Sequence, residues 1–172
     1  MKILFLTLYP SYQPSTRFRV MQFLPYLDNN YVYKVRCTMP EKLFRRFYGS
    51  RKRLERMLFH LMEFFGRLFG ILSAFRYDAV FVQKGLTTVN YRFFDLLLFL
   101  TGRPIIYDFD DAVTIGTISQ ITKFPWCIID DPNQNLRLIR KAKKIIVGNK
   151  ILKKDLSGLN SNAEVIPTPV DI

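Results

Sequence analysis

Short β-prone runs alternate with longer helical runs along the whole chain, and this order restricts the fold more than any other feature. The β-prone runs are apolar and rich in valine, isoleucine and aromatic residues, which is typical of buried strands. They are 2–8, 31–39, 78–83, 105–107, 144–147 and 164–166. Because a helical segment separates each consecutive pair, the sequence predicts an α/β fold: a Rossmann-like open parallel sheet with helices on both faces.

The helical segments are predicted from apolar residues that recur every three or four positions. They are 17–27, 42–75, 90–100, 132–142 and 150–156. We expect Gly49 and Ser50 to divide 42–75 into two helices. Residues 57–75 are expected to pack into the core, and 90–100 is predicted to be a buried helix. Residues 114–130 show no regular pattern, and one interpretation is a loop over the site.

Composition and charge indicate a folded, basic protein. The chain has 172 residues, of which 49% are hydrophobic, and this is enough to bury a core. No stretch of 18 apolar residues is free of charge, so no transmembrane helix is expected. Two cysteines and no secretory signal indicate a reducing, cytoplasmic compartment. The net charge of +12 suits nucleic acid, an anionic membrane or a phosphorylated substrate, but no nucleic-acid-binding motif accompanies it.

Three carboxylates follow the predicted strand 105–107 within four residues: Asp108, Asp110 and Asp111. Ligands of an open parallel sheet bind outside the carboxyl ends of its strands. The cluster is therefore aimed at the ligand edge, where Lys84 also lies, directly after the strand 78–83. The alternative is a polar loop with helix-capping aspartates. Neighbours on a strand point to opposite faces, which makes Asp110 the preferred ligand-facing residue.

The loop at 9–16 is rich in proline and serine and contains no glycine. The dinucleotide fingerprint is therefore absent, and NAD or FAD binding is disfavoured. Arg17 and Arg19 are expected in the first turn of the following helix, where the macrodipole disfavours cations. An anion there would meet two guanidinium groups and free backbone N–H groups, so a phosphate or carboxylate contact is predicted. The alternative is that both arginines face solvent or pair with an acid.

Seven cations within fifteen residues make 42–56 a basic segment: Lys42, Arg45, Arg46, Arg51, Lys52, Arg53 and Arg56. A basic amphipathic helix with aromatic residues can lie in a membrane interface. Each cation near an anionic leaflet contributes about 1 kcal/mol to the free energy of membrane binding. We therefore predict that this segment binds an anionic membrane surface; the alternative is a crossover helix with a solvated charged face. His60, the only histidine, is predicted to be structural.

Several segments, in order, resemble family 4 glycosyltransferases. They are Lys2–Leu6, Pro14–Val20, Phe23–Leu27, Tyr77–Lys84, Ile106–Ala112, Ala142–Asn149 and Val165–Asp171. The resemblance spans nearly the whole chain and implies the N-terminal half of a GT-B fold, in which two Rossmann-like domains enclose a cleft. It implies an acceptor-side domain at 1–165 that includes the basic amphipathic segment 42–75. The start of an interdomain linker would be 166–172, and the C-terminal donor domain is absent.

The resemblance also implies a reaction: transfer of a sugar from a nucleotide-sugar to a glycan or lipid-linked acceptor, with retention of anomeric configuration and no obligatory metal or other cofactor. Many members carry a His-Asp pair after the fourth strand. Asp110 and Asp111 stand where that pair would be, with aspartate replacing histidine, and they are the predicted catalytic residues. Arg17 falls close to the donor phosphates. The predicted substrate-binding residues are Arg17, Arg19, Lys84 and Asp108.

The implied setting is polysaccharide biosynthesis at the inner face of the membrane, by a cytoplasmic, peripheral enzyme. Without the donor domain and its paired glutamates, this chain alone is expected to be inactive. Two alternatives stay open. One is a metal-dependent transferase in which Asp108-Phe109-Asp110 is a D-x-D site for Mg²⁺ or Mn²⁺. The other is a non-catalytic remnant that binds a membrane or a protein partner.

Overall fold

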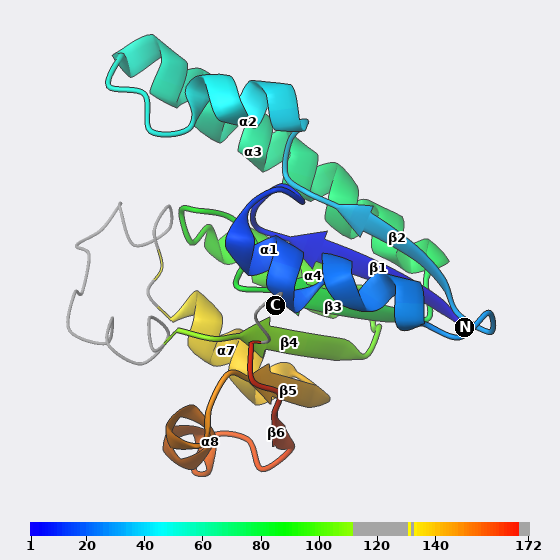
Figure 1. Cartoon of the computed structure of the whole chain (residues 1–172). Coiled ribbons are helices and arrows are strands. Elements are labelled where there is room, and N and C mark those ends of the chain that lie inside the picture. The colour runs from blue at the N-terminus through cyan, green and yellow to red at the C-terminus, as the bar shows by residue number, and fades with distance from the viewer. Residues whose placement is uncertain (112–130, 132, 169–172) are drawn as a thin grey trace.

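Six parallel strands form one open sheet in the computed structural model, which describes residues 1–111, 131 and 133–168 (Figure 1). Their order across the sheet is β2-β1-β3-β4-β5-β6. The strands are β1 (Lys2–Thr7), β2 (Val32–Arg36), β3 (Ala79–Gln83), β4 (Ile105–Phe109), β5 (Lys144–Val147) and β6 (Ala163–Val165). The parallel sheet predicted from the sequence is confirmed.

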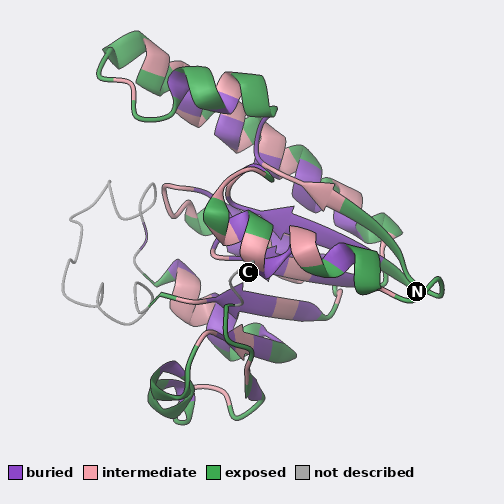
Figure 2. Cartoon of the chain, in the orientation of Figure 1, coloured by how far each residue is buried: buried purple, intermediate pink, exposed green. Residues whose placement is uncertain are grey.

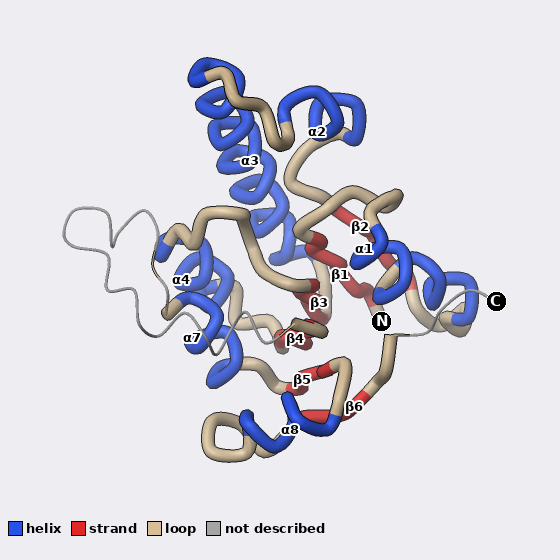
Figure 3. Tube along the Cα trace, turned by 60° about the vertical axis from the view of Figure 1, so that its left-hand side comes forward, coloured by secondary structure: helices blue, strands red, loops and turns tan. Residues whose placement is uncertain are grey.

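Helices connect the strands and lie on both faces of the sheet, as predicted. The connection from β1 to β2 runs in one direction across the sheet, and the later connections run in the other. Right-handed crossovers therefore place them on opposite faces. Figure 3 shows α3, α4 and α7 on one side of the strands and α1 on the other. The helices are α1 (Pro14–Arg19), η1 (Met21–Tyr26), α2 (Glu41–Phe47), α3 (Arg53–Ser73), η2 (Ala74–Arg76), α4 (Arg92–Leu100), α7 (Gln134–Lys141) and α8 (Lys150–Leu156).

The first helix differs from the prediction in a way that matters for the site. It begins at Pro14 and ends at Arg19, and the chain continues after Val20 as the 3₁₀ helix η1, which contains Pro25. Proline fits the first turn of a helix because the N–H it lacks has no partner there. Arg17 and Arg19 consequently lie in the last turn of α1, not the first. The macrodipole favours cations there, so the macrodipole argument for an anion beside them is wrong.

The main core lies between the sheet and the helices α3, α4 and α7. Leu4 and Leu6 of β1, Val80 and Val82 of β3 and Tyr107 of β4 are all fully buried within it. These strands are central, so each is covered on both edges by a neighbouring strand. Their continuous apolar runs are what a parallel sheet covered by helices requires.

Two buried charges hold α3 against the sheet. The Arg67 Nη2 atom donates to the Thr7 carbonyl at the end of β1, at 2.7 Å. Glu63 accepts hydrogen bonds from the Thr88 amide and hydroxyl, both at 2.7 Å. Burial lowers the pKa of Arg67 to about 10, which leaves it cationic at neutral pH. The two side chains therefore fix α3 to the end of β1 and to the loop after β3.

The inward face of α3 also touches backbone at Gly66. A Cβ atom placed at this glycine would lie 1.6 Å from the Thr38 carbonyl oxygen. The chain between β2 and α2 therefore rests directly on the helix. The predicted division of 42–75 occurs at Gly49, which adopts a φ of +76° between α2 and α3. Such a φ strains side-chain-bearing residues and suits glycine.

One face of α3 packs into the core, as predicted for 57–75, but its outward face is exposed, and so is that of α4, which was predicted to be buried. Phe69 of α3 is 61% exposed and Leu100 of α4 is 76% exposed. Figure 2 shows exposed and intermediate residues along the outer surface of α3. The apolar residues of α3 concentrate on one side of the helix, and the structure turns much of that side outward because the opposite side carries the buried Glu63 and Arg67.

We expect Gly66→Ala to lower the free energy of unfolding by about 1–3 kcal/mol or more, because the added methyl group must push the Thr38 backbone away from α3. Urea unfolding monitored by circular dichroism measures this. Gly158→Ala is the matched control, since nothing lies within 4 Å of its Cβ position. Equal stability of the two variants would contradict the close approach.

Candidate functional site

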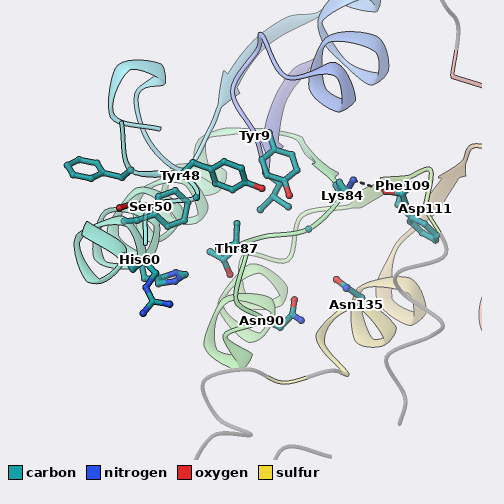
Figure 4. A pocket seen from close by; sticks show the side chains of 17 residues that line it. Tyr9, Tyr48, Ser50, His60, Lys84, Thr87, Asn90, Phe109, Asp111 and Asn135 are labelled. Carbon is teal, nitrogen blue, oxygen red and sulfur yellow. Dashed lines mark hydrogen bonds and ion pairs between the residues drawn. The ribbon is translucent and has the colours of Figure 1, made fainter. Parts of the chain in front are cut away.

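A pocket of about 560 Å³ opens at the carboxyl ends of the central strands (Figure 4). Tyr9 follows β1, Lys84 follows β3 and Asp111 follows β4, and all three side chains line it. Arg56 and His60 of α3 and Asn135 of α7 contribute other parts of the wall. The pocket lies beside the junction of β1 and β3, where the connections diverge to opposite faces and where doubly wound sheets bind ligands.

The pocket combines aromatic rings with neutral hydrogen-bonding groups and two cations. The rings include those of Tyr9, Tyr48 and Phe59. The neutral polar lining consists of Ser50, Thr87, Thr88, Asn90 and Asn135. Amides and hydroxyls both donate and accept hydrogen bonds, so they can satisfy a ligand rich in hydroxyl groups. Arg56 and Lys84 add positive charge for an anionic group.

Lys84 has an unusual backbone conformation at the centre of this edge. Its φ is +68°, which is costly for a residue with a side chain and is enriched at functional sites. Two hydrogen bonds hold it there: the Lys84 amide donates to the Asp108 carbonyl at 2.7 Å, and the Tyr107 hydroxyl donates to the Lys84 carbonyl at 3.3 Å. The Lys84 ammonium pairs with Asp111 at 2.7 Å, and both side chains are partly exposed.

Tyr9 presents a protonated hydroxyl to the same pocket. Burial, the larger cause, and the neighbouring Tyr48 together raise the pKa of Tyr9 to about 12. The two rings meet edge to face, with centroids 6.0 Å apart. The Lys84 ammonium lies 5.8 Å from the centroid of the Tyr9 ring. Tyr9 can therefore act as a neutral hydrogen-bond donor and as an aromatic surface.

Arg19 and Asp108, both predicted to bind substrate, form a buried ion pair. The Arg19 Nε atom donates to Asp108 Oδ2 at 3.2 Å and its Nη2 atom to Oδ1, and both side chains are 2% exposed. Arg19 Nη1 also donates to the Ile166 carbonyl. Burial raises the pKa of Asp108 to about 6, against the opposing effect of Arg19. For Arg19, the structure therefore shows the alternative given above, in which the arginine pairs with an acid. Substrate contact by Arg19 and Asp108 stays a prediction.

Asp110 directly follows β4, and Arg17 lies on α1, the helix that follows β1. Asp110 packs against Gly148 after β5, where a Cβ atom would lie 3.1 Å from that of Asp110. The Asp110 Oδ1 atom is enclosed and has no hydrogen-bond partner among the described residues. Arg17 is exposed on α1. Within the described chain, neither residue lines the pocket, so their sharing of one cleft stays a prediction.

The basic segment 42–56 folds as α2 and the first turn of α3. Two of its cations are paired with acids: Arg45 with Glu41 at 2.9 Å and Lys52 with Glu55 at 3.5 Å. Phe44 of α2 is fully buried, as is most of Phe47, so this helix turns its aromatic residues inward. Membrane binding by this segment stays a prediction, and on α2 its cations rather than its aromatic side chains would carry it.

Metal-ligating side chains do not gather into groups of three or more within the part of the chain that the structure describes. The Asp108 carboxylate, which a D-x-D site would need, is held by Arg19. The predicted irregular segment 114–130 lies outside the described residues.

Sequence reasoning found Lys84 and Asp111 of the pocket but missed most of its other residues. Tyr9 and Asn90 lie on loops beyond strand ends, where a functional role was foreseeable from position alone. Tyr48, which directly follows α2, and Asn135 of α7 had no such signal, because the fold brings them to the pocket from distant parts of the sequence.

The strand order and the pocket at the carboxyl edge define a doubly wound α/β domain with a pocket at the switch point, where such folds bind ligands. This fold is shared with HepE from Anabaena, whose crystal structure is a complex with UDP-glucose. The two chains align with a TM-score of 0.58 and 16% sequence identity over 99% of this chain and 44% of HepE. This chain thus spans less than half of HepE. No protein-family model and no curated protein sequence matches it.

We expect Arg19→Leu to lower the unfolding free energy by about 3–5 kcal/mol at neutral to alkaline pH, because it leaves the Asp108 carboxylate buried without its cation. Urea unfolding measures the loss. Arg45→Leu is the control, since it breaks an exposed pair, and it should cost at most about 1 kcal/mol.

The pH dependence of this loss provides a second check. The folded protein already holds the Asp108 proton more tightly than the unfolded chain, since the pKa is about 6 rather than 3.8. The stabilisation that results from this tighter proton binding is fully present below pH 3.8. It is lost as the pH rises through about 6. Without Arg19 the pKa rises further, so the deficit should be larger at about pH 8 than at about pH 5. A deficit independent of pH would contradict the pairing.

Proposed function

We propose that this chain is the acceptor-side half of a nucleotide-sugar-dependent glycosyltransferase. One observation carries the proposal: a polar and aromatic pocket lies at the switch point of a fold shared with HepE, a protein that binds UDP-glucose. The resemblance of the sequence motifs to family 4 glycosyltransferases supports the same function. A further domain would bind most of the nucleotide-sugar. This is consistent with the match to HepE, of which this chain covers 44%.

In this proposal the pocket holds a glycan or lipid-linked acceptor. Asn90 and Asn135 would bind sugar hydroxyls, and the rings of Tyr9 and Tyr48 would cover the apolar faces of a sugar ring. Lys84 would bind an anionic group of the acceptor by exchanging its contact with Asp111. The strained backbone of Lys84 keeps its ammonium in place before the acceptor arrives.

The donor would approach Asp110 and Arg17 at the same edge of the sheet. The Asp110 carboxylate would accept a hydrogen bond from a sugar hydroxyl, or stabilise the positive charge that develops on the sugar in the transition state. Arg17, exposed on α1, would meet the donor phosphates. Retention of anomeric configuration without an obligatory metal is part of the proposal, on the strength of the family resemblance.

We also propose that the enzyme works in the cytoplasm, as a peripheral protein at the inner face of the membrane. The net charge of +12 favours attraction to anionic lipid headgroups. Exposed cations of the basic segment, among them Lys42, Arg46 and Arg51, contribute to this attraction.

The test of the proposal is sugar transfer from a labelled nucleotide-sugar by the protein together with its donor domain. We expect transfer with retained configuration, read from the anomeric coupling of the product by NMR, and no turnover by the 172-residue chain alone. Transfer by this chain alone at the rate of an intact enzyme would refute the half-enzyme assignment. An inverted product would refute the retaining mechanism only.

In the two-domain enzyme, we expect Asp110→Asn to lower kcat by about 10²–10³-fold with little change in donor affinity, because the charge acts in the transition state. Arg17→Ala should instead weaken donor binding, since the phosphates keep their charge throughout. Steady-state kinetics separates the two effects. Asp155→Asn on α8 is the matched exposed control and should behave as wild type. Wild-type kinetics in both Asp110→Asn and Arg17→Ala would rule out these roles.

A further inference from the structure

We propose that the outward face of α3 and α4 inserts into the interface of an anionic lipid bilayer. Nine large apolar side chains, each between 44% and 76% exposed, form this face, which we call the apolar ridge. They are Leu54, Met57, Leu61, Phe65, Phe69 and Leu72 of α3 and Phe93, Leu96 and Leu100 of α4. Soluble proteins rarely expose so many large apolar residues together, and such patches mark interaction surfaces.

The ridge is continuous along one side of the domain. Its α3 residues recur every three or four positions, so they share one face of the helix. At about 1.5 Å per residue, the stretch from Leu54 to Leu72 is roughly 27 Å long. Packing of Phe64 against Phe93 and Phe94, with ring centroids 6.2 and 4.9 Å apart, holds α4 beside α3. The α4 residues therefore broaden the same surface.

The geometry favours a helix that lies along the membrane surface. Residues Arg53–Arg76 are long and apolar enough to cross a bilayer, and 33% of the most apolar stretch is buried in the protein. However, Glu63 and Arg67 on the opposite face are bonded to Thr88 and Thr7. These buried contacts hold α3 lengthwise against the domain, so only its outward side is free to enter the headgroup region.

The charges around the ridge identify an anionic surface as its partner. The acidic residues of α3 and α4 are either buried or hydrogen-bonded. Glu63 and Asp95 are fully buried, and the Glu55 carboxylate accepts a hydrogen bond from Ser50. The exposed charges on these two helices are cations: Arg53 and Arg92 beside the ridge, and Arg56 on the pocket side of α3. Anionic lipid headgroups complement this border. A second copy of the chain would bring the same cations together, which disfavours a dimer through the ridge.

The same half of α3 carries part of the ridge and part of the wall of the candidate acceptor pocket. Arg56 and His60 line the pocket, whereas Met57 and Leu61, the next residues of α3, belong to the ridge. A protein docked through the ridge would hold the pocket beside the headgroup layer. If the proposed function is right, this position selects an acceptor whose sugar or phosphate is carried on a lipid. The docking itself requires no sugar transfer.

Co-sedimentation with vesicles of phosphatidylglycerol and phosphatidylcholine tests the docking. We expect Leu61→Glu/Phe69→Glu to reduce binding at least tenfold, because it places two carboxylates at the anionic interface. Ile151→Glu is the control: it changes an apolar residue that is 73% exposed on α8, away from the ridge, and should bind as wild type. Both variants should unfold at the wild-type temperature, since the mutated side chains are exposed.

Two further measurements separate insertion from simple charge attraction. Tryptophan fluorescence of Phe65→Trp should be quenched by brominated lipid beyond the level of the parent protein. Lys42→Gln/Arg46→Gln on α2 should weaken binding at low salt without abolishing this quenching. Wild-type vesicle binding by the ridge variant would overturn the proposal. So would a dimer in sedimentation velocity, without lipid, that the ridge variant abolishes.

Discussion

The burial of Glu63 and Arg67 on one face of α3 is the constraint on which the rest of the structure depends. A buried charge must be compensated by hydrogen bonds, and both residues find theirs on segments that the sheet presents: the end of β1 and the loop after β3. Gly66 between them lets the chain after β2 rest on the helix. These contacts fix the rotation of α3 about its own axis. That position decides which of its apolar residues enter the core and which stay outside.

A second buried charge pair divides the carboxylates after β4 into different roles. Asp108 is used inside the protein, where Arg19 joins α1 to β4 and to the chain leaving β6. Asp111 points into the pocket and meets Lys84, whereas Asp110 packs on Gly148 with an enclosed oxygen that no described residue satisfies. The three acids are close in sequence, but they are exposed to different degrees and have different partners. Of the three, Asp111 lines the pocket, and a role for Asp110 in binding the donor is part of the proposed function.

The helix α3 therefore connects three surfaces of the molecule. Its inner face completes the core, Arg56 and His60 form one wall of the pocket, and its outer face carries the apolar ridge. Any displacement of α3 would move all three together. In the proposed enzyme, this arrangement couples the position on a membrane to the position of the acceptor, since both are set by the same rigid helix.

The sequence by itself determined the order of the elements and the parallel sheet, because apolar strand runs and the helices between them are local patterns. It also placed Lys84, Asp110 and Asp111 at the ligand edge, since each directly follows a strand. Only the tertiary structure decided that Arg19 pairs with Asp108, which is 89 residues away, and that Tyr48 and Asn135 reach the pocket. It also decided the exposed side of α3. Periodicity predicts that the apolar stripe of this helix faces the core, but the buried partners of Glu63 and Arg67 turn much of that stripe outward.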